Sequence, residues 1–105
     1  FHKWAGVTIG GAHLQLLDPH QLQPLRMCLH LLGLTRRMYG DALQWRSEAY
    51  EFVADRMAID LLFGDSEART LIDEEASAAE LDQYWRRCMK DSALFKEERA
   101  PHLRY

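Results

Sequence analysis

Two carboxylates lie among aromatic residues near the middle of the chain, in the stretch LQWRSEAYEFVADR. Glu48 and Glu51 stand three residues apart, and Trp45, Tyr50 and Phe52 flank them. Carboxylates next to aromatic residues in a loop are a common way for proteins to hold sugars and to tune acids. The same residues would also form a polar loop that covers the core with its aromatic side chains turned inward. From the residues alone, both interpretations stay open.

The histidines do not have the spacing of a metal site. The chain has five of them, at positions 2, 13, 20, 30 and 102, and no two stand four residues apart. None belongs to an HExxH pattern, so we expect no metal ion. His13 lies on the polar side of an alternating stretch, where a solvated surface histidine and a functional one remain alternatives.

Motifs for a serine nucleophile or a phosphate loop are also missing from the sequence. No serine lies in a G-x-S-x-G pattern. Gly6, Gly10 and Gly11 come before an expected strand, whereas a phosphate loop needs the oriented amides of a helix N-terminus. We therefore expect no nucleotide or other cofactor.

The composition indicates one globular domain, or part of one, over residues 1–105. Of these residues 48% are hydrophobic, which is enough for a single modest core. The formal net charge is −3 and the basic residues are interleaved with acids, so we expect no nucleic-acid partner. The longest apolar runs are too short to span a bilayer. Cys28 and Cys88 fit two buried free thiols better than a disulfide, although the disulfide stays open.

Residues 12–17 are expected to form a half-buried strand. Apolar and polar residues alternate there in the order Ala12, His13, Leu14, Gln15, Leu16. The Asp18-Pro19 pair ends the strand, because proline cannot donate a hydrogen bond to a ladder. The pair Gly10-Gly11 just before it is typical of a bulge or of a close approach by another backbone.

A helix is expected from Pro24 to about Tyr39, with Gly40 as its left-handed cap. Its apolar residues form two stripes, one of Leu25, Cys28, Leu29 and Leu32, the other of Met27, Leu31, Leu34 and Met38. A helix that is apolar over most of its circumference is usually packed on two sides. We therefore expect this helix at the centre of the domain.

The second half of the chain predicts short pieces followed by a long helix. Short extended pieces are expected near Leu43–Arg46 and Tyr50–Val53, and a short helix over Met57–Phe63 closed by Gly64. Asp65 or Ser66 caps the next helix, which turns Ala68, Leu71 and Ile72 inward. Ser77 and Glu80 form a capping box for a helix that turns Leu81, Tyr84, Trp85, Cys88 and Phe95 to one side and ends at Ala100-Pro101, before an extended tail. The predicted fold class is α+β: a small sheet with several helices packed on it.

Four stretches resemble one bacterial family, in the same order along the chain. They are FHKWAGVTIGG, the strand ending LLD, LQWRSEAYEFVADRMAIDLLFGD and the closing FKEERAPHLRY. The matching positions are Phe1, Lys3, Gly6, Gly11, Asp18, Tyr50, Glu51, Ile59, Asp60, Leu62, Gly64, Phe95, Arg99 and Tyr105. Together they are similar to the carboxyl-terminal domain of the exo-β-N-acetylmuramidases, formerly a domain of unknown function. One departure is Ile9, which stands where the family often has a cysteine.

The resemblance implies a two-domain glycosidase that releases N-acetylmuramic acid from the non-reducing ends of peptidoglycan fragments. A Rossmann-like amino-terminal domain would hold the catalytic glutamate, and the carboxyl-terminal domain would close against it to form the cleft. The resemblance also implies a periplasmic or extracellular location. This chain would then be the second domain or a fragment of it, inactive alone and without catalytic residues of its own.

Five residues are the candidates for lining the substrate cleft, namely Lys3, His13, Glu48, Tyr50 and Glu51. The implied partners are the absent amino-terminal domain and a muropeptide or amino-sugar substrate. A non-catalytic module for packing or protein interaction is the alternative function that the sequence leaves open.

Overall fold

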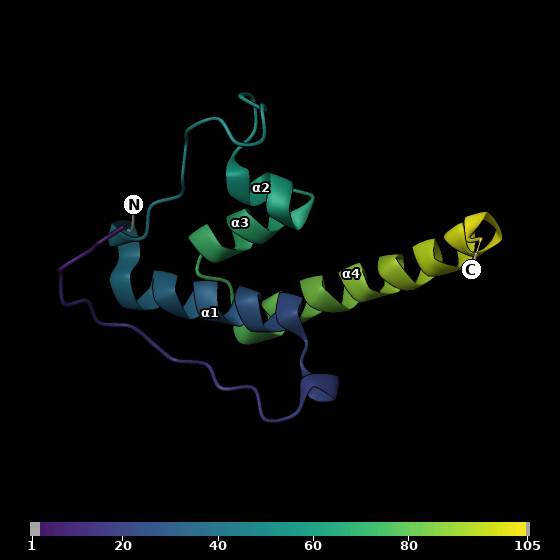
Figure 1. Cartoon of the computed structure of the whole chain (residues 1–105), viewed down its shortest axis with the longest axis horizontal. Coiled ribbons are helices and arrows are strands. Elements are labelled where there is room, and N and C mark those ends of the chain that lie inside the picture. The colour runs from purple at the N-terminus through teal and green to yellow at the C-terminus, as the bar shows by residue number, and fades with distance from the viewer. Residues whose placement is uncertain (1–2, 105) are drawn as a thin grey trace.

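Four α-helices, α1 (Pro24–Tyr39), α2 (Ala58–Phe63), α3 (Glu67–Asp73) and α4 (Ala78–Arg99), make up the computed structural model (Figure 1). Short 3-10 turns at Pro19–Gln21, Gly40–Ala42 and Ala100–His102 adjoin them. The structure describes residues 3–104. Phe1 and Tyr105, the two ends of the family-like pattern, and His2 therefore lie outside the described residues.

The predicted α+β fold with a small sheet is wrong. Within residues 3–104 there is no sheet, and the single bridge joins Tyr50 to Val53 across a turn. Residues 12–17 alternate as a strand does, but a strand is stable only beside others, and the described part of the chain places none there. The segment Leu43–Arg46, also expected to be extended, is irregular.

The predicted helix ends agree well with the structure. α1 begins at Pro24 and ends before Gly40 as predicted, but Gly40, at φ 53° and ψ −130°, is not the left-handed cap that we expected. Gly64 closes α2 in the left-handed region, at a φ of 92°. The capping box of α4 is confirmed, because Ser77 accepts from the Glu80 amide while Glu80 accepts from the Ser77 amide. After α4 the chain makes a 3-10 turn at Ala100–His102, where we expected an extended tail.

The core lies where α1, α3 and α4 meet. Its buried side chains are Leu29 of α1, Ala68 and Ile72 of α3, and Leu81 and Tyr84 of α4. A Cβ placed on Gly33 would lie 3.0 Å from the Leu81 side chain, so glycine permits the close approach of α1 to α4. Partly buried Leu71 and Trp85 pack against this cluster, as the sequence predicted.

α1 is packed on one side only, which corrects the expectation of a central helix. The stripe that includes Leu25, Leu29 and Leu32 faces the core. The second stripe stays exposed, with Met27, Leu31, Leu34 and Met38 between 37% and 63% accessible. Cys28 and Cys88 are free thiols, as favoured, but Cys28 is exposed rather than buried.

The outer half of α4 extends beyond the core and ends as the yellow helix of Figure 1. Residues 89–104 are all exposed, and Phe95 is 61% accessible, although its position on the core-facing stripe predicted burial. These residues are exposed because α4 is longer than the helices it packs against. It has 22 residues and α1 has 16, so at about 1.5 Å per residue its last turns extend past α1.

Candidate functional site

A polar hollow lies between the amino-terminal turn and the irregular segment that follows α1. Its volume is about 700 Å³, and its lining consists of Lys3, Gln44, Trp45, Arg46, Ser47 and Glu48. Lys3 reaches it from the turn at residues 3–6, and the other five come from one continuous stretch. Two of the five sequence candidates, Lys3 and Glu48, therefore line the same hollow.

Arg46 links this hollow to the next turn of the chain. Its guanidinium lies 3.5 Å from the Glu48 carboxylate, and it stands 5.9 Å from the centroid of the Tyr50 ring. Both partners are exposed enough that these contacts contribute little to stability. Arg46 was not among the sequence candidates, although it lies within the aromatic and acidic stretch that we singled out.

Residues 50–53 form a tight turn that presents Glu51 and Phe52. Tyr50 and Val53 exchange both backbone hydrogen bonds, at 3.1 Å and 2.9 Å. The two residues between them have positive φ angles, 50° at Glu51 and 67° at Phe52, a conformation that glycine or asparagine usually provides. Phe52 is nevertheless fully exposed. Backbone strain of this kind is often found at functional sites.

Trp45 anchors the irregular segment to the helices. Its indole Nε1 donates a hydrogen bond of 2.8 Å to Asp73 at the end of α3, and it packs against the core. Asp73 also accepts from Arg36 of α1, whose guanidinium stands 6.0 Å from the Trp45 ring centroid. One aromatic residue of the segment is thus turned inward and another, Phe52, outward, so the two interpretations of this stretch each apply to part of it.

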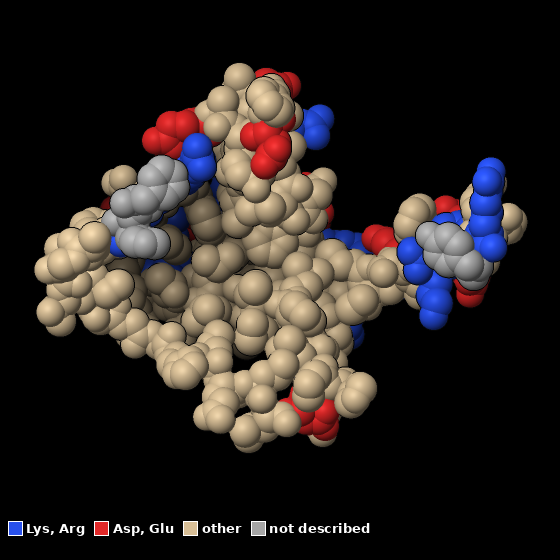
Figure 2. Space-filling view, in the orientation of Figure 1, with Lys and Arg blue, Asp and Glu red and all other residues tan. Residues whose placement is uncertain are grey.

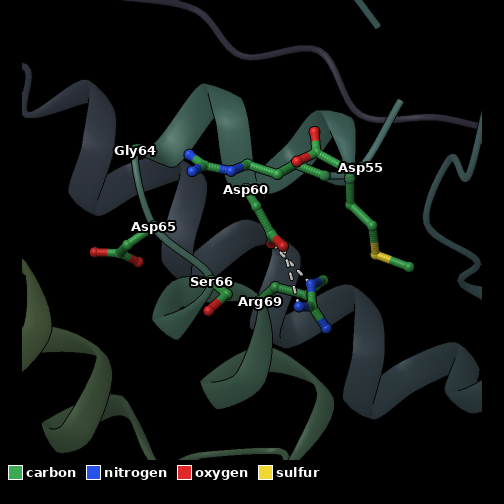
Figure 3. A pocket seen from close by; sticks show the side chains of 8 residues that line it. Asp55, Asp60, Gly64, Asp65, Ser66 and Arg69 are labelled. Carbon is green, nitrogen blue, oxygen red and sulfur yellow. Dashed lines mark hydrogen bonds and ion pairs between the residues drawn. The ribbon is translucent and has the colours of Figure 1, made fainter. Parts of the chain in front are cut away.

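A second polar groove lies between α2 and α3 (Figure 3), with a volume of about 560 Å³. Asp60 points across it to Arg69, which donates from two nitrogens at 2.8 Å and 3.0 Å. The hydrogen bond from Arg69 to Asp60 raises the pKa of Arg69. The pair joins two helices, so this bidentate ion pair serves the fold.

Asp65 lies on the other side of that groove and points away from the pair (Figure 3). It accepts hydrogen bonds from the amides of Glu67 and Ala68, so Asp65 rather than Ser66 caps α3. It also accepts from the Tyr84 hydroxyl at 3.2 Å, and burial raises the pKa of that hydroxyl, which therefore stays protonated. The two acids Asp60 and Asp65 in this groove therefore both make contacts that stabilise the fold.

Asp82 joins α4 to the polar edge of α1. Arg26 donates to both of its oxygens, and Nε2 of His30 lies 2.8 Å from one of them. These hydrogen bonds hold the pKa of Asp82 well below its usual range. The Arg26 guanidinium also stands 5.2 Å from the Trp85 ring centroid. The cluster was not predicted, because residues 26 and 82 are far apart in sequence and nothing in their spacing relates them.

His13 is not brought to the hollow. It lies in the exposed segment before α1 and is not part of the lining that contains Lys3 and Glu48. Arg46 connects Glu48 with Tyr50, and Glu51 follows at the tip of the turn. The structure therefore brings Lys3 and Glu48 together in one hollow, and Tyr50 and Glu51 belong to the turn that follows it in the chain.

The family model described as "Exo-beta-N-acetylmuramidase NamZ, C-terminal" matches residues 1–105, the whole chain. The chain belongs to this family. The resemblance found in the sequence is thereby confirmed, and the hollow and turn are features of a NamZ carboxyl-terminal domain. No curated protein and no solved structure matched the chain.

Two further properties of this NamZ domain concern membrane spans and metal sites. Across residues 3–104, no helix combines the length and apolar composition needed to cross a bilayer. The same residues contain no group of three histidine, cysteine or acidic side chains placed to hold a metal ion.

Proposed function

We propose that this chain forms the substrate-supporting wall of the cleft in an exo-β-N-acetylmuramidase and is inactive without the amino-terminal domain. The observation behind the proposal is the hollow that Lys3, Arg46 and Glu48 line together, with Arg46 also 5.9 Å from the Tyr50 ring of the adjoining 50–53 turn. Residues from two separate segments meet there.

The chemistry of the hollow suits an acidic amino sugar. N-acetylmuramic acid has hydroxyl and amide groups and a carboxylate on its lactyl ether. Lys3 and Arg46 are cations that would pair with that carboxylate, since charge-assisted hydrogen bonds are the strong ones. Ser47 and Gln44 offer donors and acceptors for hydroxyls, and the exposed ring of Phe52 offers an apolar face.

The acids on this surface are poorly placed for hydrolysis by the chain alone. Glycoside cleavage needs two carboxyl groups about 5 Å apart or about 6.5–9.5 Å apart, on either side of the bond. They must also be held rigidly, because small displacements lower the rate by orders of magnitude. Glu48 and Glu51 are three residues apart, and both side chains are exposed to solvent. A support role fits them better than a catalytic one.

The test compares the 105-residue chain with the full-length protein on a chromogenic N-acetylmuramide. We expect release of N-acetylmuramic acid by the full-length protein and none by the chain alone. Restored activity on mixing the chain with a separately produced amino-terminal part would support two walls of one cleft. Robust hydrolysis by the chain alone would contradict the proposal and move the catalytic groups onto Glu48 or Glu51.

A further inference from the structure

The segment before α1 has the alternating sequence of a strand, but among residues 3–104 no strand lies beside it. Its apolar residues Val7, Ile9, Leu14 and Leu16 are 52–64% exposed. Among the described residues, no hydrogen bond joins the backbone of residues 8–17 to any other part of the chain. In Figure 1 the segment runs as a thin trace outside the helices. Its amides and carbonyls are thus open along their whole length, as they are on an unpaired edge.

A bulge at the glycine pair would bring five apolar residues of this segment to one face. In a regular strand Val7 and Ile9 would point to one side, and Ala12, Leu14 and Leu16 to the other, because side chains alternate. A bulge at Gly10-Gly11 adds one residue and reverses the alternation. The five apolar side chains then share a face, and Thr8, His13 and Gln15 share the opposite one. Bulges belong mainly to antiparallel pairs, so the glycines indicate an antiparallel neighbour.

The exposed stripe of α1 is a second unpartnered surface on the same side of the molecule. Met27, Leu31, Leu34 and Met38 repeat every three to four residues, and they lie opposite the stripe that faces the core. Figure 1 places residues 7–17 on the side of α1 opposite α2 and α3. In Figure 2 that part of the surface has almost no charged side chains. A sheet with an apolar face would cover both features together.

We propose that residues 7–16 add as a bulged strand to the edge of an antiparallel sheet supplied by the preceding part of the same muramidase, with the apolar face of that sheet over the exposed stripe of α1. A second copy of this domain is a poor occupant, because its described residues form no sheet and it could offer only this segment, and a two-stranded ribbon alone is marginal. The preceding part is covalently attached, which raises its effective concentration. The proposal rests on family membership and not on the proposed cleft.

Amide hydrogen exchange at single-residue resolution tests the proposal, with the full-length protein and the 105-residue chain compared in the absence of substrate. In an antiparallel strand with one neighbour, only every second amide donates a hydrogen bond to that neighbour. We expect alternate amides within residues 8–16 to exchange about 100-fold more slowly in the full-length protein and all of them to exchange fast in the chain alone. Equally fast exchange of all these amides in both proteins would overturn the proposal. Alternate protection in the chain alone that grows with its concentration would also overturn it, in favour of self-association.

A matched pair of variants separates strand addition from simple burial. Leu14→Asp places a charge on the apolar face, and Gln15→Asp places the same charge on the polar face of the same strand. We expect the first to abolish the alternate protection in the full-length protein and the second to leave it in place, with the helical circular dichroism unchanged in both. Equal effects of the two variants would contradict the facial arrangement. Since the readout is amide exchange, the result is independent of whether the enzyme turns over a muramide.

Discussion

The guanidinium of Arg26 donates hydrogen bonds of 2.7 Å and 2.8 Å to the two carboxylate oxygens of Asp82. This bidentate pair, with His30 beside it, ties the first turns of α1 to the start of α4. The two residues stand 56 positions apart, so the contact fixes how the long helix crosses the rest of the domain.

The first prediction concerns the pH dependence of this contact. The folded-state pKa of Asp82 is depressed, so its contribution to stability is present above the unfolded value of about 3.9 and is lost as the pH falls below it. Asp82→Asn should lower the urea midpoint at pH 7, and the difference from the parent should shrink as the pH falls from 5 toward 2. Asp91→Asn, on the exposed part of α4, is the control. A difference that stays constant down to the lowest pH would contradict the assignment.

The second prediction concerns the capping box. Ser77→Ala removes the acceptor for the Glu80 amide and should lower the free energy of unfolding by about 1 kcal/mol. Ser92→Ala, an exposed serine inside the same helix, should change it much less. Denaturation curves of the two variants provide the measurement, and equal midpoints would mean that Ser77 is not the cap.

The third prediction concerns the two sides of α1. Leu29→Ala should lower the free energy of unfolding of this chain by about 3 kcal/mol, because Leu29 is fully buried and its removal leaves a cavity. Leu31→Ala removes the same atoms from the exposed stripe and should cost less than about 1 kcal/mol. Similar losses in chemical denaturation would mean that both sides of α1 are packed.

The fourth prediction concerns the anchor of the irregular segment. Asp73→Ala removes the acceptor of the Trp45 indole and of Arg36. The segment should then open more often, so a protease that cuts after arginine should cleave at Arg46 and Arg56 faster than in the parent. Glu74→Ala, one residue further on and exposed, is the control. Unchanged cleavage rates would show that Trp45 is held by other contacts.

The helices were predictable because their signals are local. Pro24, Gly64 and the Ser77–Glu80 capping box mark helix ends within a few residues of sequence, and the structure places the ends there or one residue away. The predicted sheet, which the described residues do not form, rested on a weaker kind of signal. Alternation at residues 12–17 describes a side-chain pattern, but a strand also needs a neighbour, and the described residues provide none.

The candidate surface was predicted in part. Three of the candidates, Glu48, Tyr50 and Glu51, lie within four residues of sequence. They are therefore close together whatever the fold of the rest of the chain. Lys3 was identified through the family resemblance, and its position across the hollow from Glu48 depends on the path of the whole chain. His13 does not line this hollow, and its polar position in an expected strand said nothing about which surface it shares.

The most direct test of the support role is a steady-state kinetic comparison in the full-length muramidase, with Arg46→Ala and Glu51→Gln against their controls Arg86→Ala and Glu74→Gln. Loss of one hydrogen bond to a charged group costs about 1.5–3 kcal/mol, so Arg46→Ala should raise KM for the muramide about 10-fold or more. Residues that bind substrate and transition state equally affect KM and leave kcat nearly unchanged. We therefore predict a higher KM with a nearly unchanged kcat for Arg46→Ala and Glu51→Gln, and parental values for both controls. A KM unchanged in all four variants, or a kcat lowered by orders of magnitude in Glu51→Gln, would contradict the account.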